Sequence, residues 1–414
     1  DHPVVGEESF HVYLPHRHGE NILLRRVCHI RDFTLDTALV HHDHAIAHAE
    51  DFGQFTADHD DAGGNPAVQA TDTVIKDTII PTVSANAIAA NTYIIGDTVN
   101  VVVDFNENVT VGTSERIQLT FDTMAAAPVY ANYVSGDGTT QVTYAYTIVE
   151  GDEDLNSIDS AASIDVNGGS IVDANANPSD YNLVTTNYAS TLVDGIKALI
   201  TNVTIAPNTY IIGDNVDVVI TYDDNVTVAG GTPDFALTFE TNTGSPTAAL
   251  TTGTGTNTLT FRYTVIAGNE DVNGLDTAAA INLAGATIKD TNGNDAYLNL
   301  SSTNFAAALI DAIVPTVAIT NPVDASYINI ASDSATFTVD GTCSENGQTV
   351  LIKVDGVIAT SPLGLVCDGT NFTGSIDTTG LAEGARAFTA ELTDTGGNTG
   401  VSGANNPIKD ITAP

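Results

Sequence analysis

Carboxylate and amide side chains alternate in two loops, and each loop occurs twice in the sequence. The longer loop reads GDEDLNSID from Gly151 and returns as GNEDVNGLD from Gly268, while the shorter one reads DANAN from Asp173 and returns as DTNGN from Asp290. The candidate oxygen ligands are Asp152, Asp154, Asn156, Asp159, Asp173, Asn175, Asn177, Asn269, Asp271, Asn273, Asp276, Asp290, Asn292 and Asn294. Ca²⁺ takes six to eight hard oxygen ligands, and such loops supply them. We therefore predict that at least one loop type binds Ca²⁺. The alternative is that these Asx residues form turns by bonding to their own backbone, and turns would be copied just as faithfully.

A second candidate site lies near the amino terminus, where all ten histidines occur within the first 59 residues. The stretch HHDHAIAH places His44 and His48 four residues apart, on one side of a helix if a helix forms here. His41 and Asp43 would complete a zinc- or copper-type set of ligands. The alternative is a polar, histidine-rich segment that titrates near pH ~6.5 and binds no specific metal.

The charge balance restricts the partners. Asp and Glu number 52 against 12 Lys and Arg, so the formal net charge is −40. A surface this negative repels nucleic acids and anionic membranes and suits divalent cations or high salt. No apolar run reaches the length of about 18 residues that a membrane span requires. No GxSxG, P-loop or HExxH motif is present, and we expect no enzymatic activity.

The elements that position these loops belong to an internal repeat. Asn91–Val111 returns as Asn208–Val228, 117 residues later, with 14 of 21 positions identical. Asp77, Asp194 and Asp311 keep the same spacing. The predicted organisation is a His-rich segment (1–62), a linker (63–76), three units (77–193, 194–310 and 311–409) and a last stretch (410–414) that is a linker or the start of another unit. The first segment is too short and polar to bury a core of its own, which favours a role in assembly or strand donation.

Alternating apolar residues predict the fold of the units. Val142, Tyr144, Tyr146 and Ile148 alternate with polar or small residues, and Leu259, Phe261, Tyr263 and Val265 repeat the pattern. With Gly, Asn and Asp turns about every ten residues, period two predicts strands with one buried face. The expected fold class is all-β, with β-sandwiches in a linear array behind the His-rich segment.

Longer phrases carry a family resemblance. GDNVDVVITYDDNVTV, GTPDFALTF, GTGTNTLTFRYTVIAGNEDVNGLD and AGATIKDTNGNDA resemble the tandem bacterial immunoglobulin-like repeats of large extracellular surface proteins and adhesins. Residues 311–409 resemble a shorter repeat type of such proteins. The resemblance covers 77–414 and implies an extracellular structural or adhesive role, but it names no ligand.

The three cysteines divide into a pair and a remainder. Cys343 and Cys367 lie 24 residues apart in the same predicted sandwich. In an exported chain such a pair predicts a disulfide. Cys28 is left over, and we expect it to form no bridge, the alternative being a bond to another subunit.

Three functions are compatible with these observations to different degrees. The first is a subunit of a self-assembling extracellular filament or surface layer, in which residues 1–62 join copies end to end and the units act as spacers. The second is a stalk within a longer, calcium-stiffened adhesin that contacts a host or neighbouring cell surface. The third is a secreted enzyme with accessory modules, which is disfavoured because only residues 1–62 lie outside the repeats.

Overall fold

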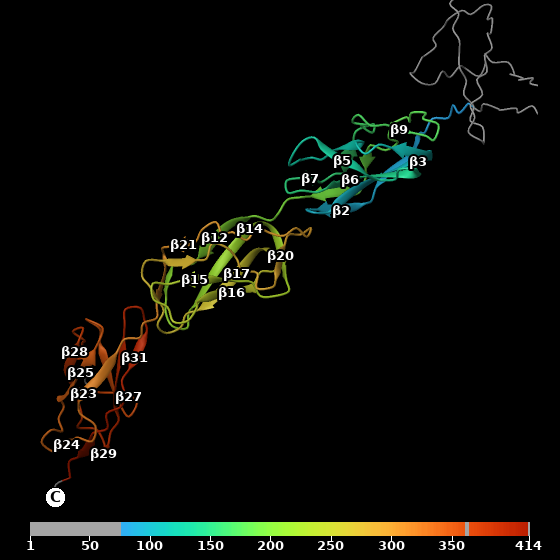
Figure 1. Ribbon diagram of the computed structural model, residues 1–414. Helices are drawn as coiled ribbons and strands as arrows, with labels where there is room; N and C mark the ends of the chain where they lie inside the picture. Colours follow the sequence, from blue (N-terminus) through green and yellow to red (C-terminus); the bar gives the residue numbers. More distant parts are fainter. Residues whose placement is uncertain (1–75, 361–363, 413–414) are drawn as a thin grey trace, which may run out of the picture. The chain divides into compact units, whose positions relative to one another are not determined.

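The computed structural model describes residues 76–360 and 364–412, which contain β-strands and no helix (Figure 1). The predicted class, all-β with successive β-sandwiches, is confirmed. The strands fall into three successive groups, here called sandwiches 1, 2 and 3. No apolar helix of bilayer-spanning length occurs in the described part of the chain.

Sandwich 1 combines a large sheet with a small one. Its strands are β1 (Val83–Ile88), β2 (Asn91–Ile94), β3 (Thr98–Val111), β4 (Arg116–Thr120), β5 (Val129–Ser135), β6 (Thr139–Thr147), β7 (Glu153–Asp154), β8 (Ile158–Ser160), β9 (Ile171–Val172), β10 (Asn187–Tyr188) and β11 (Thr191–Asp194). The large sheet has the order β1-β3-β6-β5-β4-β8-β10, with β9 added to β3. The small sheet has the order β2-β11-β7.

Sandwich 2 repeats this topology strand for strand, as expected for a duplicated unit. Its strands are β12 (Ile200–Ile205), β13 (Asn208–Tyr210), β14 (Asn215–Ala229), β15 (Asp234–Thr238), β16 (Thr247–Thr252), β17 (Thr256–Thr264), β18 (Glu270–Asp271), β19 (Leu275–Thr277), β20 (Thr287–Lys289), β21 (Asn304–Phe305) and β22 (Ala308–Asp311). The sheets have the orders β12-β14-β17-β16-β15-β19-β21, with β20 on β14, and β13-β22-β18.

Sandwich 3 is smaller. Its strands are β23 (Val317–Asn321), β24 (Tyr327–Asn329), β25 (Phe337–Cys343), β26 (Val350–Val354), β27 (Val357–Ile358), β28 (Asn371–Ile376), β29 (Gly384–Ala385), β30 (Phe388–Thr393), β31 (Thr399–Val401) and β32 (Ile408–Asp410). They form the sheets β23-β25-β28, β24-β32-β29 and β27-β26-β30-β31.

Each sandwich has its own apolar core, built from the inward residues of alternating strands. Val142, Tyr144 and Ile148 are buried and Tyr146 is half-buried. The copies Leu259, Phe261, Val265 and Tyr263 follow the same order. The period-two prediction is therefore confirmed in both long sandwiches.

Two strand pairings place the short acidic loops and the sandwich ends. β3 pairs with β9, and β14 pairs with β20, so the DANAN and DTNGN loops each follow a short strand held by the long one. At the other end of each sandwich, an early strand runs parallel to the last one: β2 with β11, β13 with β22, and β24 with β32. These parallel pairs align Ile94 with Asp194 and Asn329 with Asp410.

Candidate functional site

Asp152, the first carboxylate of the longer acidic loop, acts as a buried hydrogen-bond acceptor. Its Oδ1 accepts from the Ala125 backbone N–H (3.0 Å). Its Oδ2 accepts from the Tyr146 hydroxyl (2.7 Å) and the Val149 N–H (3.1 Å), and the residue is fully buried. Burial, together with the bond to Asp152, raises the pKa of Tyr146, so this hydroxyl stays protonated and remains a donor.

The copy of this position carries no charge. Asn269 is also fully buried. In the amide orientation that satisfies its partners, its Nδ2 donates to the Tyr263 hydroxyl (2.6 Å) and the Ile266 carbonyl (3.1 Å), while its Oδ1 accepts from the Thr243 N–H (3.1 Å). A neutral amide thus bonds to the tyrosine, the turn residue and the loop N–H that correspond to the partners of Asp152, although it meets the Ile266 carbonyl where Asp152 meets the Val149 N–H. This favours a structural role at this position over metal ligation.

Asp154 and Asn156, further along the longer loop, have hydrogen-bond partners different from those of Asp152. Asp154 Oδ1 accepts from the N–H groups of Asn156 (3.1 Å) and Ser157 (2.8 Å), which is an Asx turn. Burial raises the pKa of Asp154, and nearby acidic side chains add to the rise. Asn156 Nδ2 donates to Asp122.

Elsewhere in this loop and its copy, the carboxylates accept from amide or backbone N–H donors. Asp159 Oδ1 accepts from Asn187 Nδ2 (2.7 Å), and Asp276 Oδ1 accepts from Asn304 Nδ2 (2.6 Å). Asp271 Oδ1 accepts from the Asn273 and Gly274 N–H groups, and Asn273 Nδ2 donates to Glu240. Each of these carboxylates therefore has N–H donors of its own.

The shorter loop has the spacing Asp-x-x-x-Asn, and all three sandwiches contain it. Asp173 Oδ1 accepts from the Asn175 and Asn177 N–H groups, and its Oδ2 accepts from Asn177 Nδ2. Asp290 Oδ1 accepts from the N–H groups of Asn292, Gly293 and Asn294. The third example, Asp394 with Asn398, repeats this bonding.

The final asparagine of this loop bonds to the preceding sandwich. Asn294 Oδ1 accepts from the Ile95 N–H (2.9 Å), and its Nδ2 donates to the carbonyls of Asp194 (3.0 Å) and Ile196 (3.3 Å). Asn398 does the same one sandwich later, accepting from the Ile212 N–H (3.2 Å) and donating to the Asp311 carbonyl (2.8 Å). We call this arrangement the asparagine clasp: one loop asparagine, one backbone N–H after the early parallel strand, and one carbonyl at the end of the last strand.

Packing accompanies the clasp. The glycine before each clasp asparagine has a positive φ, +111° at Gly293 and +110° at Gly397. A Cβ added at Gly293 would lie 3.6 Å from Ile94 Cδ1, and one added at Gly397 would lie 3.5 Å from Ile211 Cδ1. Each loop glycine therefore packs close to an isoleucine of the preceding sandwich. At the junction between sandwiches 1 and 2 (the first junction), Lys197 Nζ also forms an ion pair with Glu150 (3.0 Å). Glu150 accepts a further hydrogen bond from the Tyr297 hydroxyl.

Acidic groups gather around both clasps. Asp290 is 5% exposed, and its Oδ2 has no hydrogen-bond partner among the described residues. A cleft of about 310 Å³ at this junction is lined by Glu153, Leu155, Asp194, Ile196, Lys197, Ala198, Asp223, Asp224 and Asn292. At the second junction, burial and then the charge of Asp394 raise the pKa of Asp311.

These residues fit a metal only in part. Within residues 76–360 and 364–412, no group of three or more His, Cys, Asp or Glu side chains is placed to hold a metal ion. Each described carboxylate of the predicted Ca²⁺ loops accepts from at least one N–H donor, as the turn alternative expects. Asp290 Oδ2 is a buried oxygen of these loops without a hydrogen-bond partner among the described residues, and Ca²⁺ binding remains a prediction.

Sandwich 3 contains the predicted disulfide. Cys343, at the end of β25, is bonded to Cys367, with their Cα atoms 5.9 Å apart. This confirms the pairing. The histidine set His41, Asp43, His44 and His48, together with Cys28, lies outside the described residues, so those predictions stay untested.

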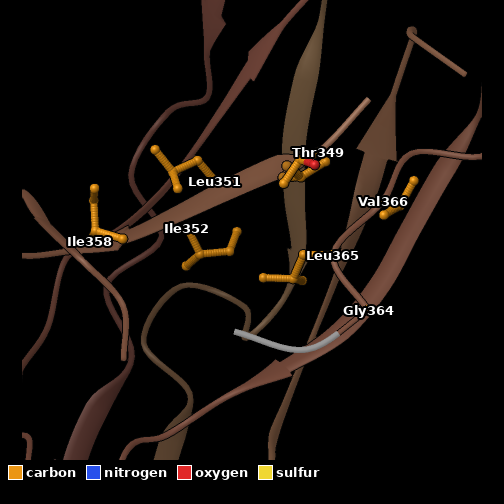
Figure 2. A pocket seen from close by; sticks show the side chains of 8 residues that line it. Thr349, Leu351, Ile352, Ile358, Gly364, Leu365 and Val366 are labelled. Atoms are coloured by element: carbon orange, nitrogen blue, oxygen red, sulfur yellow. The ribbon is translucent and has the colours of Figure 1, made fainter. Parts of the chain in front are cut away.

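Sandwich 3 also holds a small apolar cavity of about 190 Å³ (Figure 2). Its lining comes from Thr349, Val350, Leu351, Ile352, Ile358, Gly364, Leu365 and Val366. Figure 2 shows aliphatic side chains around the space, with the Thr349 hydroxyl among them. Ligand pockets are usually larger, at about 300–1,000 Å³, and hold several convergent polar groups. This cavity is therefore not a candidate ligand site.

No protein-family model and no curated protein matches the sequence. Among solved structures, the chain is similar to a Ca²⁺-stabilised adhesin with which an Antarctic bacterium binds ice, at 18% identity over 80% of this chain and 75% of that one, with a TM-score of 0.37. It is also similar to the BSP domain of a biofilm-associated protein (11% identity, 83% and 68% coverage, TM-score 0.23) and to the I9–I11 tandem of titin (11%, 79% and 100%, 0.29). Similarity at this level does not extend to what those proteins bind.

Proposed function

We propose that the chain is a non-enzymatic structural or adhesive protein of an extracellular surface, in which the immunoglobulin-like sandwiches act as rigid spacers. The observation that supports this role is the asparagine clasp, which recurs with the same atoms at two successive junctions. A rigid spacer needs contacts that fix consecutive units to each other, and the hydrogen bonds of the clasp are such contacts. The high negative charge keeps such a chain solvated and separate from other acidic surfaces.

The test compares Asn294→Ala/Asn398→Ala with the unchanged chain by ¹⁵N relaxation. If the clasps stiffen the chain, the sandwiches of the double variant tumble more independently and their apparent correlation times fall. Asn100→Ala, at an exposed position of β3, is the matched control and should leave the correlation times unchanged. Equal correlation times in all three proteins would contradict the spacer role.

Self-assembly is the finer part of the proposal. Residues 1–62 join copies end to end by adding a strand to an exposed sheet edge, such as β1 or β10 at the ends of the large sheet of sandwich 1. Deleting residues 1–62 should then leave folded monomers. Polymers that survive the deletion, seen by electron microscopy, would refute this route to a filament.

The alternative is a stalk within a longer adhesin, stiffened by Ca²⁺. The clasps favour it, because they connect consecutive sandwiches of one chain. Asp290 Oδ2, which has no partner among the described residues, and Asp311, whose pKa is raised, mark places where a cation would relieve a buried or crowded carboxylate. Calcium should then raise the melting temperature, and a chelator should lower it. An unchanged melting temperature would end the calcium proposal.

A further inference from the structure

The asparagine clasp has two halves, and sandwich 3 carries one of them exposed. The receiving half is a backbone N–H and a carbonyl: Ile95 with Asp194 in sandwich 1, and Ile212 with Asp311 in sandwich 2. The parallel pairing of β24 with β32 places Asn329 beside Asp410, as β2 and β11 place Ile94 beside Asp194. Ile330 and Asp410 are therefore the receiving half of sandwich 3.

The local turn supports this alignment. The N–H of Ile94 donates to Asp97, three residues later (3.1 Å), and that of Ile211 donates to Asp214 (3.0 Å). In sandwich 3, the N–H of Asn329 donates to the Ser332 hydroxyl (2.9 Å) with the same spacing. The N–H of Ile330 thus occupies the position that donates to the clasp asparagine in the other sandwiches.

Exposure shows that this half is uncovered within the described residues. Ile330 is 73% exposed, whereas the clasped Ile212 is 38% exposed and Ile95 is half-buried. Asp410 is exposed, while Asp194 and Asp311 are half-buried. Among the described hydrogen bonds, none involves the Ile330 N–H. One difference remains: Asn329 replaces Ile94 and Ile211, so the apolar contact with the loop glycine is missing here.

We propose that Ile330 and Asp410 form a docking surface for the Asp-x-x-x-Asn loop of a further immunoglobulin-like unit that continues the chain. The loop asparagine would accept from the Ile330 N–H and donate to the Asp410 carbonyl. The occupant is a covalently joined unit because the clasp holds only a few hydrogen bonds, too few to offset the entropy that separate chains lose on association. A short linker supplies the effective concentration that makes such a contact form. This inference rests on the proposed spacer role and names the partner of the exposed receiving half of sandwich 3.

The test adds a fourth unit to the full chain. Residues 410–414 correspond to residues 311–315, which precede sandwich 3, so a second copy of residues 316–412 is joined directly after Pro414. Hydrogen exchange of the Ile330 amide is then measured by NMR. One net hydrogen bond should slow its exchange by about fivefold relative to the unextended chain. Replacing the added unit's counterpart of Asn398 by alanine should restore fast exchange, and calorimetry verifies that the added unit is folded.

Two outcomes would overturn the proposal. The first is unchanged Ile330 exchange in the extended chain while Ile212, clasped by Asn398, stays protected. The second is equal protection of Ile330 when micromolar unlinked chain is added instead, which would assign the surface to contacts between separate copies. If the spacer role itself is wrong, the result is different. The amides of Ile95 and Ile212, at the two existing clasps, would then exchange as fast as the amide of Ile330 in the unextended chain.

Discussion

Asp152 accepts three hydrogen bonds at a position that solvent does not reach. A buried carboxylate is costly unless donors surround it, and here two backbone N–H groups and the Tyr146 hydroxyl do so. The copy, Asn269, bonds to the corresponding tyrosine, turn residue and loop N–H without a charge, two of these bonds being donated by its amide. At this position the acidic pattern therefore reflects the bonding of a turn.

This comparison predicts that Asp152→Asn is tolerated and Asp152→Ala is not. Asparagine can copy the bonding of Asn269, whereas alanine leaves buried donors unpaired, at a cost of about 2–3 kcal/mol. Urea unfolding of sandwich 1 measures both. If asparagine costs as much as alanine, the charge itself is needed, and Ca²⁺ ligation by Asp152 regains support.

Lys409 is a buried cation in sandwich 3. Its side chain is fully buried, and its Nζ lies 3.0 Å from Asp333 and 2.7 Å from the Thr378 carbonyl. The corresponding residues in the other sandwiches, Val193 and Ile310, are apolar. The fold therefore does not require a charge at this position.

Breaking this pair should cost far more than replacing it. Asp333→Ala leaves an uncompensated buried ammonium and should destabilise sandwich 3 by about 3–5 kcal/mol. The double variant Asp333→Leu/Lys409→Met removes both charges and should lie within about 1–2 kcal/mol of the native stability. Chemical denaturation distinguishes them. A double variant as unstable as Asp333→Ala would mean that the pair has a role that apolar packing cannot replace.

At the scale of elements, the disulfide ties the end of β25 to the loop before β28. It spans 24 residues and restricts the unfolded state of sandwich 3. We predict that Cys343→Ala/Cys367→Ala lowers the stability of this sandwich by about 3 kcal/mol in the chain-entropy model. Calorimetry should show its transition move while those of sandwiches 1 and 2 stay in place, and reductant should have the same effect on the native chain. A shift in all transitions would contradict this assignment.

Strands are predictable from this sequence because their signal is local. Val142 and Tyr144 stand two residues apart, and a period-two pattern needs only one buried face. The role of Asn294 depends instead on Ile95 and Asp194, which lie 199 and 100 residues away along the chain. No local pattern encodes such contacts. The signal that the sequence does contain is the repeated Asp-x-x-x-Asn spacing, which Asp394 and Asn398 share.

At the scale of the whole molecule, the junctions should respond to pH. The pKa of Asp311 is raised by burial and then by Asp394, so the folded state holds this proton more tightly than the unfolded state. Stability from this group is fully present below the ordinary aspartate pKa of about 3.8–3.9 and is lost as pH rises through the folded value.

Asp311→Asn should therefore stabilise the second junction at neutral pH by up to about 1 kcal/mol after solvent screening. The gain should shrink as the pH falls toward 4. Melting temperatures of both proteins between pH 4 and 7 give the difference. If the difference in melting temperature between the two proteins stays constant across this range, the protonation of Asp311 does not contribute to the stability of the folded state.

The parallel pairs β2·β11, β13·β22 and β24·β32 have a mechanical consequence. When tension pulls the two ends of a sandwich apart, parallel strands are drawn in opposite directions along their own axes. Their hydrogen bonds are then strained together instead of one after another, so the sandwich resists sudden extension more strongly than an unzipping hairpin does. The pair in sandwich 1 aligns four residues, Asn91–Ile94 with Thr191–Asp194, against three in each of the others. Under steady pulling, sandwich 1 is therefore expected to yield after sandwich 2, the copy that shares its topology.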